Sequence, residues 1–218
     1  MLRKYHKHII WDWNGTILDD VEIALLCINT MLRKRKMAEL NLEGYRRIFG
    51  FPVIESYKTL GFKFDSHAEW DAVSREFHAY YDESSPRASL TKGVVATLDG
   101  IRRQNIPMSI LSASELVSLE AMLTKHGIRK YFDRVYGLSD KYGGSKLELG
   151  RKLIADIGMM PCEVLYIGDT DHDYEVSEAI GCECVLYLHG HQDRQRIGGC
   201  DCIKIESFAE LSICQRKI

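Results

Sequence analysis

The stretch HIIWDWNGTILDD, residues 8–20, holds the first side chain that could do chemistry. Asp12 follows an apolar run, and a tight turn at Asn14 and Gly15 comes directly after it. An aspartate in this position can be a nucleophile or a metal ligand, but Asp-x-Asn-Gly also makes a good turn. Asp12 alone therefore leaves a catalytic and a structural interpretation open.

A second acidic group lies in GDTDHD, residues 168–173. Asp169 and Asp173 follow another apolar run, with Asp171 between them. Such a cluster is costly unless a positive charge neutralises it, and hard oxygen ligands with room for water suit Mg²⁺. The alternative is a solvated acidic loop.

Two further residues could bind a phosphoryl group. Ser112 ends an apolar run and precedes the helical pattern ASELVSLEAML, whose first amides, beginning at Ala113, could hold a phosphate oxygen beside the serine hydroxyl. A serine there is more often only a helix cap. Lys146, before another helical pattern, could balance the charge of Asp12 and a phosphoryl group, although a lone lysine is usually a surface residue.

Short apolar runs alternate with helical patterns along the chain. This alternation predicts an α/β fold whose parallel sheet has crossover helices, a Rossmann-like core. Ligands of such sheets bind outside the carboxyl ends of the strands, so the polar residues at these ends should converge. The expected strands lie within residues 8–13, 107–114, 163–173, 182–188 and 202–205.

The segment between the first two expected strands, roughly residues 20–88, has a different pattern. Its apolar residues recur at helical spacing, and no convincing strand lies between them. The segment is too long for a simple crossover. It is therefore expected to be a helical insertion over the sheet, with the polar stretch around Pro86 as its return linker.

Composition limits the possible partners and locations. The 218 residues are 45% hydrophobic and 28% charged, with a net charge of −2, which gives no electrostatic case for nucleic acid or an anionic membrane. The basic N-terminus is followed by too few apolar residues before Asp12 for a signal peptide, and no stretch is long enough to span a membrane. Seven cysteines, an odd number, favour free thiols in a reducing compartment, so we expect a cytoplasmic protein.

A group of cysteines and histidines near the end of the chain suggests zinc as an alternative metal. The spacing is Cys-x-Cys rather than Cys-x-x-Cys, and the pairs fall within or beside expected strands. Alternation would put such pairs on one face of a strand, where cysteine is a common small core residue. The group consists of Cys182, Cys184, His189, His191, Cys200 and Cys202.

In their order and spacing these motifs resemble those of the haloacid dehalogenase-like hydrolases, of the phosphoglycolate phosphatase type with a helical cap. In that superfamily the first strand ends in Asp-x-Asp-x-Thr, the second in Ser or Thr, a lysine follows, and the last motif is Gly-Asp with a further acid. The resemblance covers nearly the whole chain, with a core of residues 1–18 and 88–218 and a cap of residues 19–87. The matching positions are Asp12, Thr16, Ser112, Lys146, Asp169 and Asp173.

The resemblance implies phosphoryl transfer through an aspartyl phosphate on Asp12. Mg²⁺ would be held by Asp12, the backbone carbonyl of Asn14 and Asp169, with Asp173 in support. Ser112 and Lys146 would stabilise the charge on the transferring group. The phosphate-binding set would be completed by Thr16, Ala113 and, in the cap, Gly50.

Asn14 departs from the family pattern, which has an aspartate there as general acid and base. An amide cannot take that role at neutral pH, and losing it typically costs about 10² to 10⁴ in rate. A substitute could come from His172, Asp19 or Asp20, or from deamidation of Asn14 in the Asn-Gly dipeptide.

Other outcomes stay open at this point. The chain could be a pseudo-enzyme that binds a phosphorylated ligand, or it could carry out phosphonatase or phosphomutase chemistry. A phosphonatase would need a Schiff-base lysine from the cap, and nothing marks Lys58 or Lys63 as activated. The expected partner is a small phosphorylated metabolite, whose choice Phe49, Phe51 and Tyr57 would shape, and the chain is expected to be a monomer or homodimer.

Overall fold

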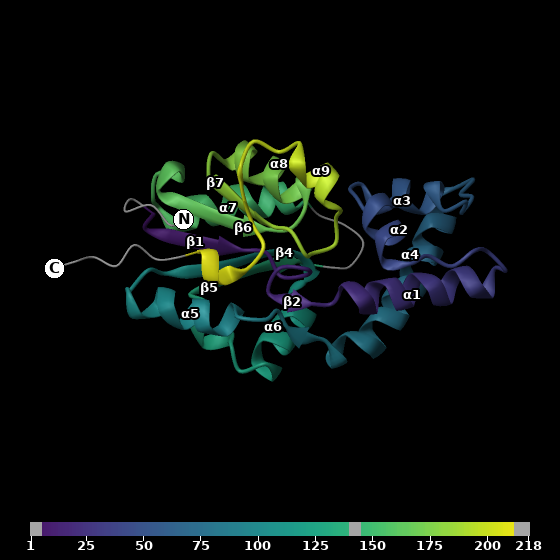
Figure 1. The fold of residues 1–218 in the computed structure, drawn as a ribbon, viewed down its shortest axis with the longest axis horizontal. Helices are drawn as coiled ribbons and strands as arrows, with labels where there is room; N and C mark the ends of the chain where they lie inside the picture. Colours follow the sequence, from purple (N-terminus) through teal and green to yellow (C-terminus); the bar gives the residue numbers. More distant parts are fainter. Residues whose placement is uncertain (1–5, 140–144, 212–218) are drawn as a thin grey trace.

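The computed structural model describes residues 6–139 and 145–211 and contains a six-stranded parallel sheet (Figure 1). The strand order is β5-β4-β1-β6-β7-β8, so β1 lies between β4 and β6. The bounds are β1 His8–Trp11, β4 Met108–Glu115, β5 Arg134–Leu138, β6 Val164–Gly168, β7 Glu183–Tyr187 and β8 Ile203–Ile205. The predicted α/β fold with a Rossmann-like parallel core is confirmed.

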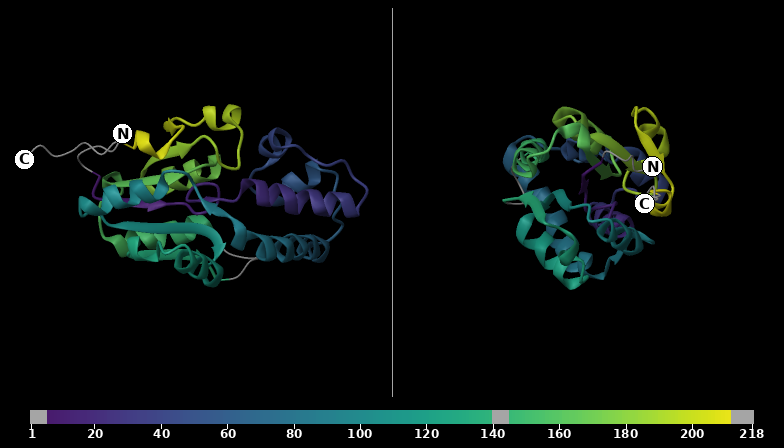
Figure 2. Two further views of the ribbon diagram at one scale, coloured as in Figure 1. Left: turned by 60° about the horizontal axis from the view of Figure 1, so that its bottom comes forward. Right: turned by 90° about the vertical axis from the view of Figure 1, so that its left-hand side faces the viewer.

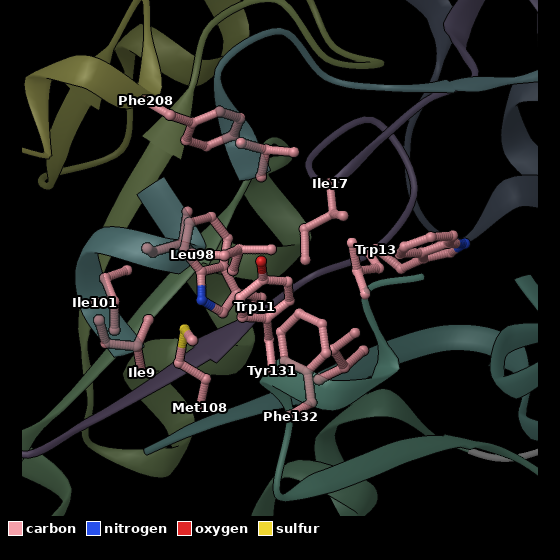
Figure 3. Close-up of a cluster of buried hydrophobic side chains, with 14 of the residues drawn as sticks. Ile9, Trp11, Trp13, Ile17, Leu98, Ile101, Met108, Tyr131, Phe132 and Phe208 are labelled. Atoms are coloured by element: carbon pink, nitrogen blue, oxygen red, sulfur yellow. The ribbon is translucent and has the colours of Figure 1, made fainter. Parts of the chain in front are cut away.

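Successive residues of β1 point to opposite faces of the sheet and enter different cores. Ile9 and Trp11 belong to one buried cluster, together with side chains of α5 (Val94–Arg103) and α6 (Leu116–Lys125). Figure 3 shows this cluster, in which the Trp11 ring meets Phe208 edge to face at 5.6 Å. Ile10 enters the opposite cluster, under α7 (Lys146–Ile157) and α8 (Asp171–Ile180). Helices thus cover both faces and leave the strand ends free for a site.

The segment between β1 and β4 is helical, as predicted. It contains α1 (Val21–Lys34), α2 (Leu42–Ile48), α3 (Val53–Thr59) and α4 (His67–Ser84). A short antiparallel pair, β2 (Leu18–Asp19) with β3 (Ser89–Leu90), closes its base. These helices share a separate apolar cluster and stand beyond one end of the sheet in Figures 1 and 2. The division into a core of residues 1–18 and 88–218 and a cap of residues 19–87 stays a prediction.

The structure corrects the expected surroundings of Ser112. That residue does not end its strand, because β4 continues to Glu115 and α6 begins only at Leu116. The extension follows from an irregular pairing with β5, in which Glu115 is opposite Leu138. Ala113 consequently lies within a strand and not in the first turn of a helix. The strand β5 itself was not predicted.

Short elements complete the described part of the fold. Helix α9 (Arg194–Gly198) lies between β7 and β8, and single turns of 3-10 helix occupy Ser85–Arg87, Arg129–Tyr131, Pro161–Glu163 and Phe208–Glu210. In the part of the chain that the structure describes, no helix combines the length and apolar character needed to cross a membrane.

Candidate active site

Three carboxylates meet at the carboxyl ends of the neighbouring strands β1 and β6. Asp12 follows β1, and its backbone N–H donates to the carbonyl of Ile167 in β6 at 2.8 Å. Asp169 follows β6, and Asp173 lies in the first turn of α8. Their ligand oxygens lie within 4.8 Å of one another, and all three residues are buried. The convergence expected from the sequence is therefore present.

Lys146 places a positive charge inside this carboxylate group. It begins α7, is 7% exposed, and donates from Nζ to Oδ1 of Asp12 and to Oδ1 of Asp173, the latter at 2.6 Å. Burial disfavours its charged form, but Asp12 and Asp173 together raise the pKa of Lys146 above its ordinary value. The lysine is thus a buried cation.

The two acids that flank Lys146 differ in their electrostatics. Burial raises the pKa of Asp12 well above its ordinary value against the pull of Lys146, and Asp173 and Asp169 add to the increase. For Asp173 burial is outweighed by Lys146 and by hydrogen bonds from Thr170, which lower its pKa. A bound cation would favour the ionised form of Asp12.

Asp173 has a structural role that fixes its orientation. Thr170 caps α8, and Oδ2 of Asp173 accepts hydrogen bonds from the Thr170 backbone N–H at 3.0 Å and hydroxyl at 2.7 Å, closing a capping box. Its other oxygen accepts from Lys146 and from the Tyr166 hydroxyl. These hydrogen bonds fix the orientation of Asp173 beside Lys146.

Asp169 is held between two glycines. Its carboxylate accepts hydrogen bonds from the Thr16 hydroxyl and from the backbone N–H of His191, both at 2.8 Å. A Cβ at Gly15 would lie 2.5 Å from Asp169 Oδ2, and one at Gly190 would also come closer than 3.0 Å. Glycine is required at both positions for the main chain to approach this carboxylate. Burial raises the pKa of Asp169 to about 6, with Asp173 adding to the effect and His191 opposing it.

The side chain of Asn14 is fully engaged with protein groups. Its Oδ1 accepts a hydrogen bond from the Ser114 hydroxyl at 2.6 Å, and its Nδ2 donates to Asp20 at 2.9 Å and to the Tyr81 hydroxyl at 2.7 Å. Both amide hydrogens are therefore used, and the side chain has none to offer a leaving group in this arrangement.

Two of the predicted phosphate-binding residues, Ser112 and Gly50, already form hydrogen bonds with neighbouring protein groups. Ser112 is buried in β4 next to β1, and its Oγ accepts from the Ser114 backbone N–H at 3.0 Å. The Gly50 backbone N–H donates to Ser56 Oγ at 3.1 Å, and the guanidinium of Arg196 lies against the glycine. The amide of Gly50 is thus committed to its own loop.

Of the three substitute acids suggested by the sequence, Asp20 is the one that contacts Asn14. The ring of His172 lies 4.5 Å from that of Phe51 instead, and Asp19 borders a cavity at the base of the helical insertion together with Arg46. Lys58 forms an exposed ion pair with Glu55 at 2.7 Å, so it has no activated environment.

The two histidines of the cysteine-rich group, His189 and His191, lie in different surroundings. His191 lies with its Nε2 3.2 Å from Asp20, and His189 forms an ion pair with Glu206 at 2.9 Å. Cys184 belongs to the buried cluster under α8, and Cys202 packs against that cluster. The position of His191 in the sequence could have indicated a place in the site, because it follows the carboxyl end of a predicted parallel strand.

The charges of the site suit a divalent cation. Burial opposes a charge on His191, but Asp20 and Asp169 raise its pKa to about 8. Burial likewise opposes ionisation of Asp20, yet His191 and the hydrogen bonds from Tyr81 and Asn14 lower its pKa. When all groups are ionised, the site has two positive and four negative side chains, so its net charge is −2. The positive side chains are Lys146 and His191, and the negative ones are Asp12, Asp20, Asp169 and Asp173. Oxygen ligands with this excess charge fit a hard ion such as Mg²⁺.

The family model described as haloacid dehalogenase-like hydrolase matches residues 9–187. The phosphoglycolate phosphatase of Photobacterium profundum is 27% identical over an alignment of 222 positions that spans 94% of this chain and 93% of that protein. The phosphoglycolate phosphatase of Synechococcus elongatus is 23% identical over 189 residues, 87% of each chain.

Solved structures show the same fold. A haloacid dehalogenase-like family hydrolase from Streptococcus pneumoniae superposes with a TM-score of 0.78 at 18% identity, over 96% of this chain and 98% of that one. CbbY from Rhodobacter sphaeroides, in complex with xylulose-(1,5)bisphosphate, superposes with a TM-score of 0.68 at 18% identity, over 94% and 96% of the two chains.

Proposed function

The chain belongs to the haloacid dehalogenase-like hydrolase family, and from this premise we propose that it is a Mg²⁺-dependent phosphatase that hydrolyses a small phosphate monoester through Asp12. Its curated relatives are phosphatases, so the chain is an enzyme of the phosphatase type. The observation that carries this proposal is the buried group of Asp12, Asp169 and Asp173, in which Lys146 bridges Asp12 and Asp173.

The proposed reaction has two steps. The carboxylate of Asp12 attacks phosphorus, an aspartyl phosphate forms, and the bond from phosphorus to the leaving oxygen breaks. Water then hydrolyses the aspartyl phosphate and regenerates Asp12. Lys146 and Ser112 would stabilise the charge on the transferring group, and Thr16 would hold Asp169 in place.

Asp12 and Asp169, with the backbone carbonyl of Asn14 and with Asp173 in support, would hold the Mg²⁺ ion. The ion would bring phosphate oxygens beside Asp12 and neutralise their charge. Ala113 and Gly50 stay candidates for phosphate contacts only if their segments rearrange when the substrate binds.

The substrate is proposed to be small. Asp12 is 5% exposed, and the helical insertion stands beyond the sheet end that carries it. Two relatives are named for phosphoglycolate, and the ligand of CbbY is a sugar bisphosphate, which supports a two-carbon or sugar phosphate. The proposed setting is the cytoplasm, with the chain as a monomer or homodimer.

Turnover should be slow for esters whose leaving oxygen needs a proton, because the amide hydrogens of Asn14 are already bonded to Asp20 and Tyr81. The same observation favours a second candidate function, a protein that binds a phosphorylated ligand with little turnover. Aryl phosphates separate the two, because their leaving group departs without protonation.

The test is phosphate release from an aryl phosphate and from a panel of two-carbon and sugar phosphates, with Mg²⁺ or with EDTA. We expect metal-dependent turnover that Asp12→Asn abolishes, while the exposed control Asp201→Asn retains it. Turnover that persists in Asp12→Asn would overturn the proposed mechanism. Phosphate binding without hydrolysis of even the aryl ester would establish the binding protein instead.

A further inference from the structure

Asp20 and His191 form a buried pair at the junction of three parts of the chain. We propose that they are positioning residues that couple the docked helical insertion, residues 19–87, to the carboxylates that would hold the metal. The inference rests on the proposed function, because it assigns the pair a task in metal binding and turnover.

Asp20 lies between β2 and α1 and is 1% exposed. Its Oδ1 accepts hydrogen bonds from the backbone N–H of Gly15 at 2.8 Å and from His191 Nε2 at 3.2 Å. Its Oδ2 accepts from the Asn14 amide at 2.9 Å and from the Tyr81 hydroxyl at 2.5 Å. One carboxylate therefore joins the turn after Asp12, helix α4 of the insertion and the loop after β7.

His191 extends these contacts to helix α2 and to Asp169. Its Nδ1 lies 2.8 Å from the hydroxyl of Tyr45 in α2, and its backbone N–H donates to Asp169 at 2.8 Å. Its ring also packs on Gly15, where an added Cβ would lie 2.5 Å from Cδ2 of the imidazole. Movement of this histidine would therefore move one of the two hydrogen-bond donors to the Asp169 carboxylate.

The loop after β7 holds α2 through further hydrogen bonds. Arg46 donates from its guanidinium to the carbonyls of Gly190 at 2.9 Å and His189 at 2.7 Å. Gln192 donates from Nε2 to the carbonyl of Phe49 at 3.3 Å. The docked position of α2 and the path of this loop are thus linked, and the Asp20–His191 pair lies where the loop, α2 and α4 meet.

A purely structural buried pair would have a different signature. Breaking it would lower the unfolding free energy, but folded protein would bind metal and substrate as before. Breaking a positioning pair must instead change how the folded protein binds metal and substrate. Removing the hydroxyls of Tyr45 and Tyr81 tests this directly, because it removes the hydrogen bonds from α2 and α4 to the pair and leaves every carboxylate in place.

The experiment compares wild type with Asp20→Asn, with the double variant Tyr45→Phe/Tyr81→Phe, and with Tyr174→Phe as the matched control. The control loses a hydroxyl bonded to Glu178 within α8. Calorimetric titration with Mg²⁺ alone gives the metal affinity, and aryl phosphate hydrolysis gives kcat and KM. Amide hydrogen exchange over residues 42–48 of the metal-free protein reports the docking of α2.

We expect Asp20→Asn to weaken Mg²⁺ binding about tenfold and to lower kcat by a similar factor. The double tyrosine variant should weaken Mg²⁺ binding at least threefold, raise KM more than it lowers kcat, and accelerate exchange in α2. Tyr174→Phe should stay within twofold of wild type in every measurement. If Asp20→Asn does not fold, the double tyrosine variant still tests the inference.

The inference would be overturned if the folded variants stayed within twofold of wild type in Mg²⁺ affinity, in KM and in the amide exchange of α2. This result is distinct from failure of the proposed function. If wild type binds Mg²⁺ but hydrolyses no ester, the proposed function fails, and the affinity and exchange measurements still decide the role of the pair. If wild type hydrolyses the aryl phosphate and the variants match it, the function stands and the pair is only structural.

Discussion

The side-chain amide of Asn14 donates a hydrogen bond to the carboxylate of Asp20 across 2.9 Å. Asn14 follows the central strand β1 and Asp20 directly precedes α1 of the helical insertion, so the contact spans the turn that links these two parts. Gly15 and Tyr81 also donate to the Asp20 carboxylate, and hydrogen bonds to a carboxylate stabilise its ionised form. An amide at position 14 is complementary to it, whereas a carboxylate there would face a second carboxylate.

Asn14→Asp should therefore destabilise the chain in a pH-dependent way. Two carboxylates this close share a proton, which raises one folded-state pKa above its unfolded value. Stability is then lost as the pH rises through the raised pKa. We expect a cost of roughly 1–3 kcal/mol near neutral pH and a smaller one near pH 5, measured by urea unfolding at both values.

The exchange variant Asn14→Asp/Asp20→Asn is the matched control. It restores one amide and one carboxylate to the pair, so a double-mutant cycle should give a favourable coupling energy. Unfolding curves of Asn14→Asp that match wild type at both pH values would contradict the prediction and the contact on which it rests.

Lys146→Met should leave two buried carboxylates without their cation. Asp12 and Asp173 both accept hydrogen bonds from the lysine, and removing one partner of a buried ion pair typically costs about 3–5 kcal/mol. Mg²⁺ should restore part of this stability, because it supplies positive charge to the same oxygens. Urea unfolding with EDTA and with Mg²⁺ measures both effects.

Lys152→Met controls for the loss of a lysine from α7, because Lys152 is exposed on the same helix. Its effect should stay below about 1 kcal/mol, and Mg²⁺ should not change it. Equal effects of the two substitutions would mean that Lys146 does not bridge the carboxylates.

Gly190→Ala should displace Asp169. Its Cβ would approach the Asp169 carboxyl group closer than 3.0 Å, while a Cβ at Gly198 in α9 would meet no atom within 4 Å. We expect Gly190→Ala to weaken Mg²⁺ binding and to cost roughly 1–3 kcal/mol of unfolding free energy. Gly198→Ala should leave metal affinity unchanged. Calorimetry with both variants checks this, and equal affinities would show that Asp169 tolerates the shift.

Local patterns in the sequence were sufficient to predict the parallel core, because each buried strand is a short apolar run that ends in polar residues. Strand β5 was missed for a physical reason. Its residues RVYGL include an arginine and a glycine, and most of them are only partly buried at the edge of the sheet. An edge strand needs fewer apolar residues, so its pattern is weak.

The carboxylates and Lys146 could be predicted because each follows or precedes a regular element at the same end of the sheet. The contacts of Asn14 could not be. They join Asn14 to Asp20, Tyr81 and Ser114, and Tyr81 reaches Asn14 only when the insertion docks on the core. Asp20 was one of three candidate substitutes, and no spacing rule pairs it with His191.

His8 carries a prediction that is separate from the site. It lies in β1 at 1% exposure, and its Nε2 is 2.8 Å from the hydroxyl of Ser109 in β4. Burial lowers the pKa of His8 to about 4 from 6.5, with Arg134 adding to the decrease and Asp133 opposing it.

Because the folded-state pKa of His8 is below the unfolded value, the unfolded chain takes up the proton first as the pH falls. The stability that this residue contributes is complete above about pH 6.5 and is lost toward about pH 4, by roughly 1.4 kcal/mol per pH unit. His8→Gln cannot titrate, so the difference in unfolding free energy between wild type and this variant should be constant above pH 6.5 and should shift against wild type below it. Urea unfolding of both proteins across this range measures the difference, and parallel curves throughout would show that His8 is not buried in its neutral form.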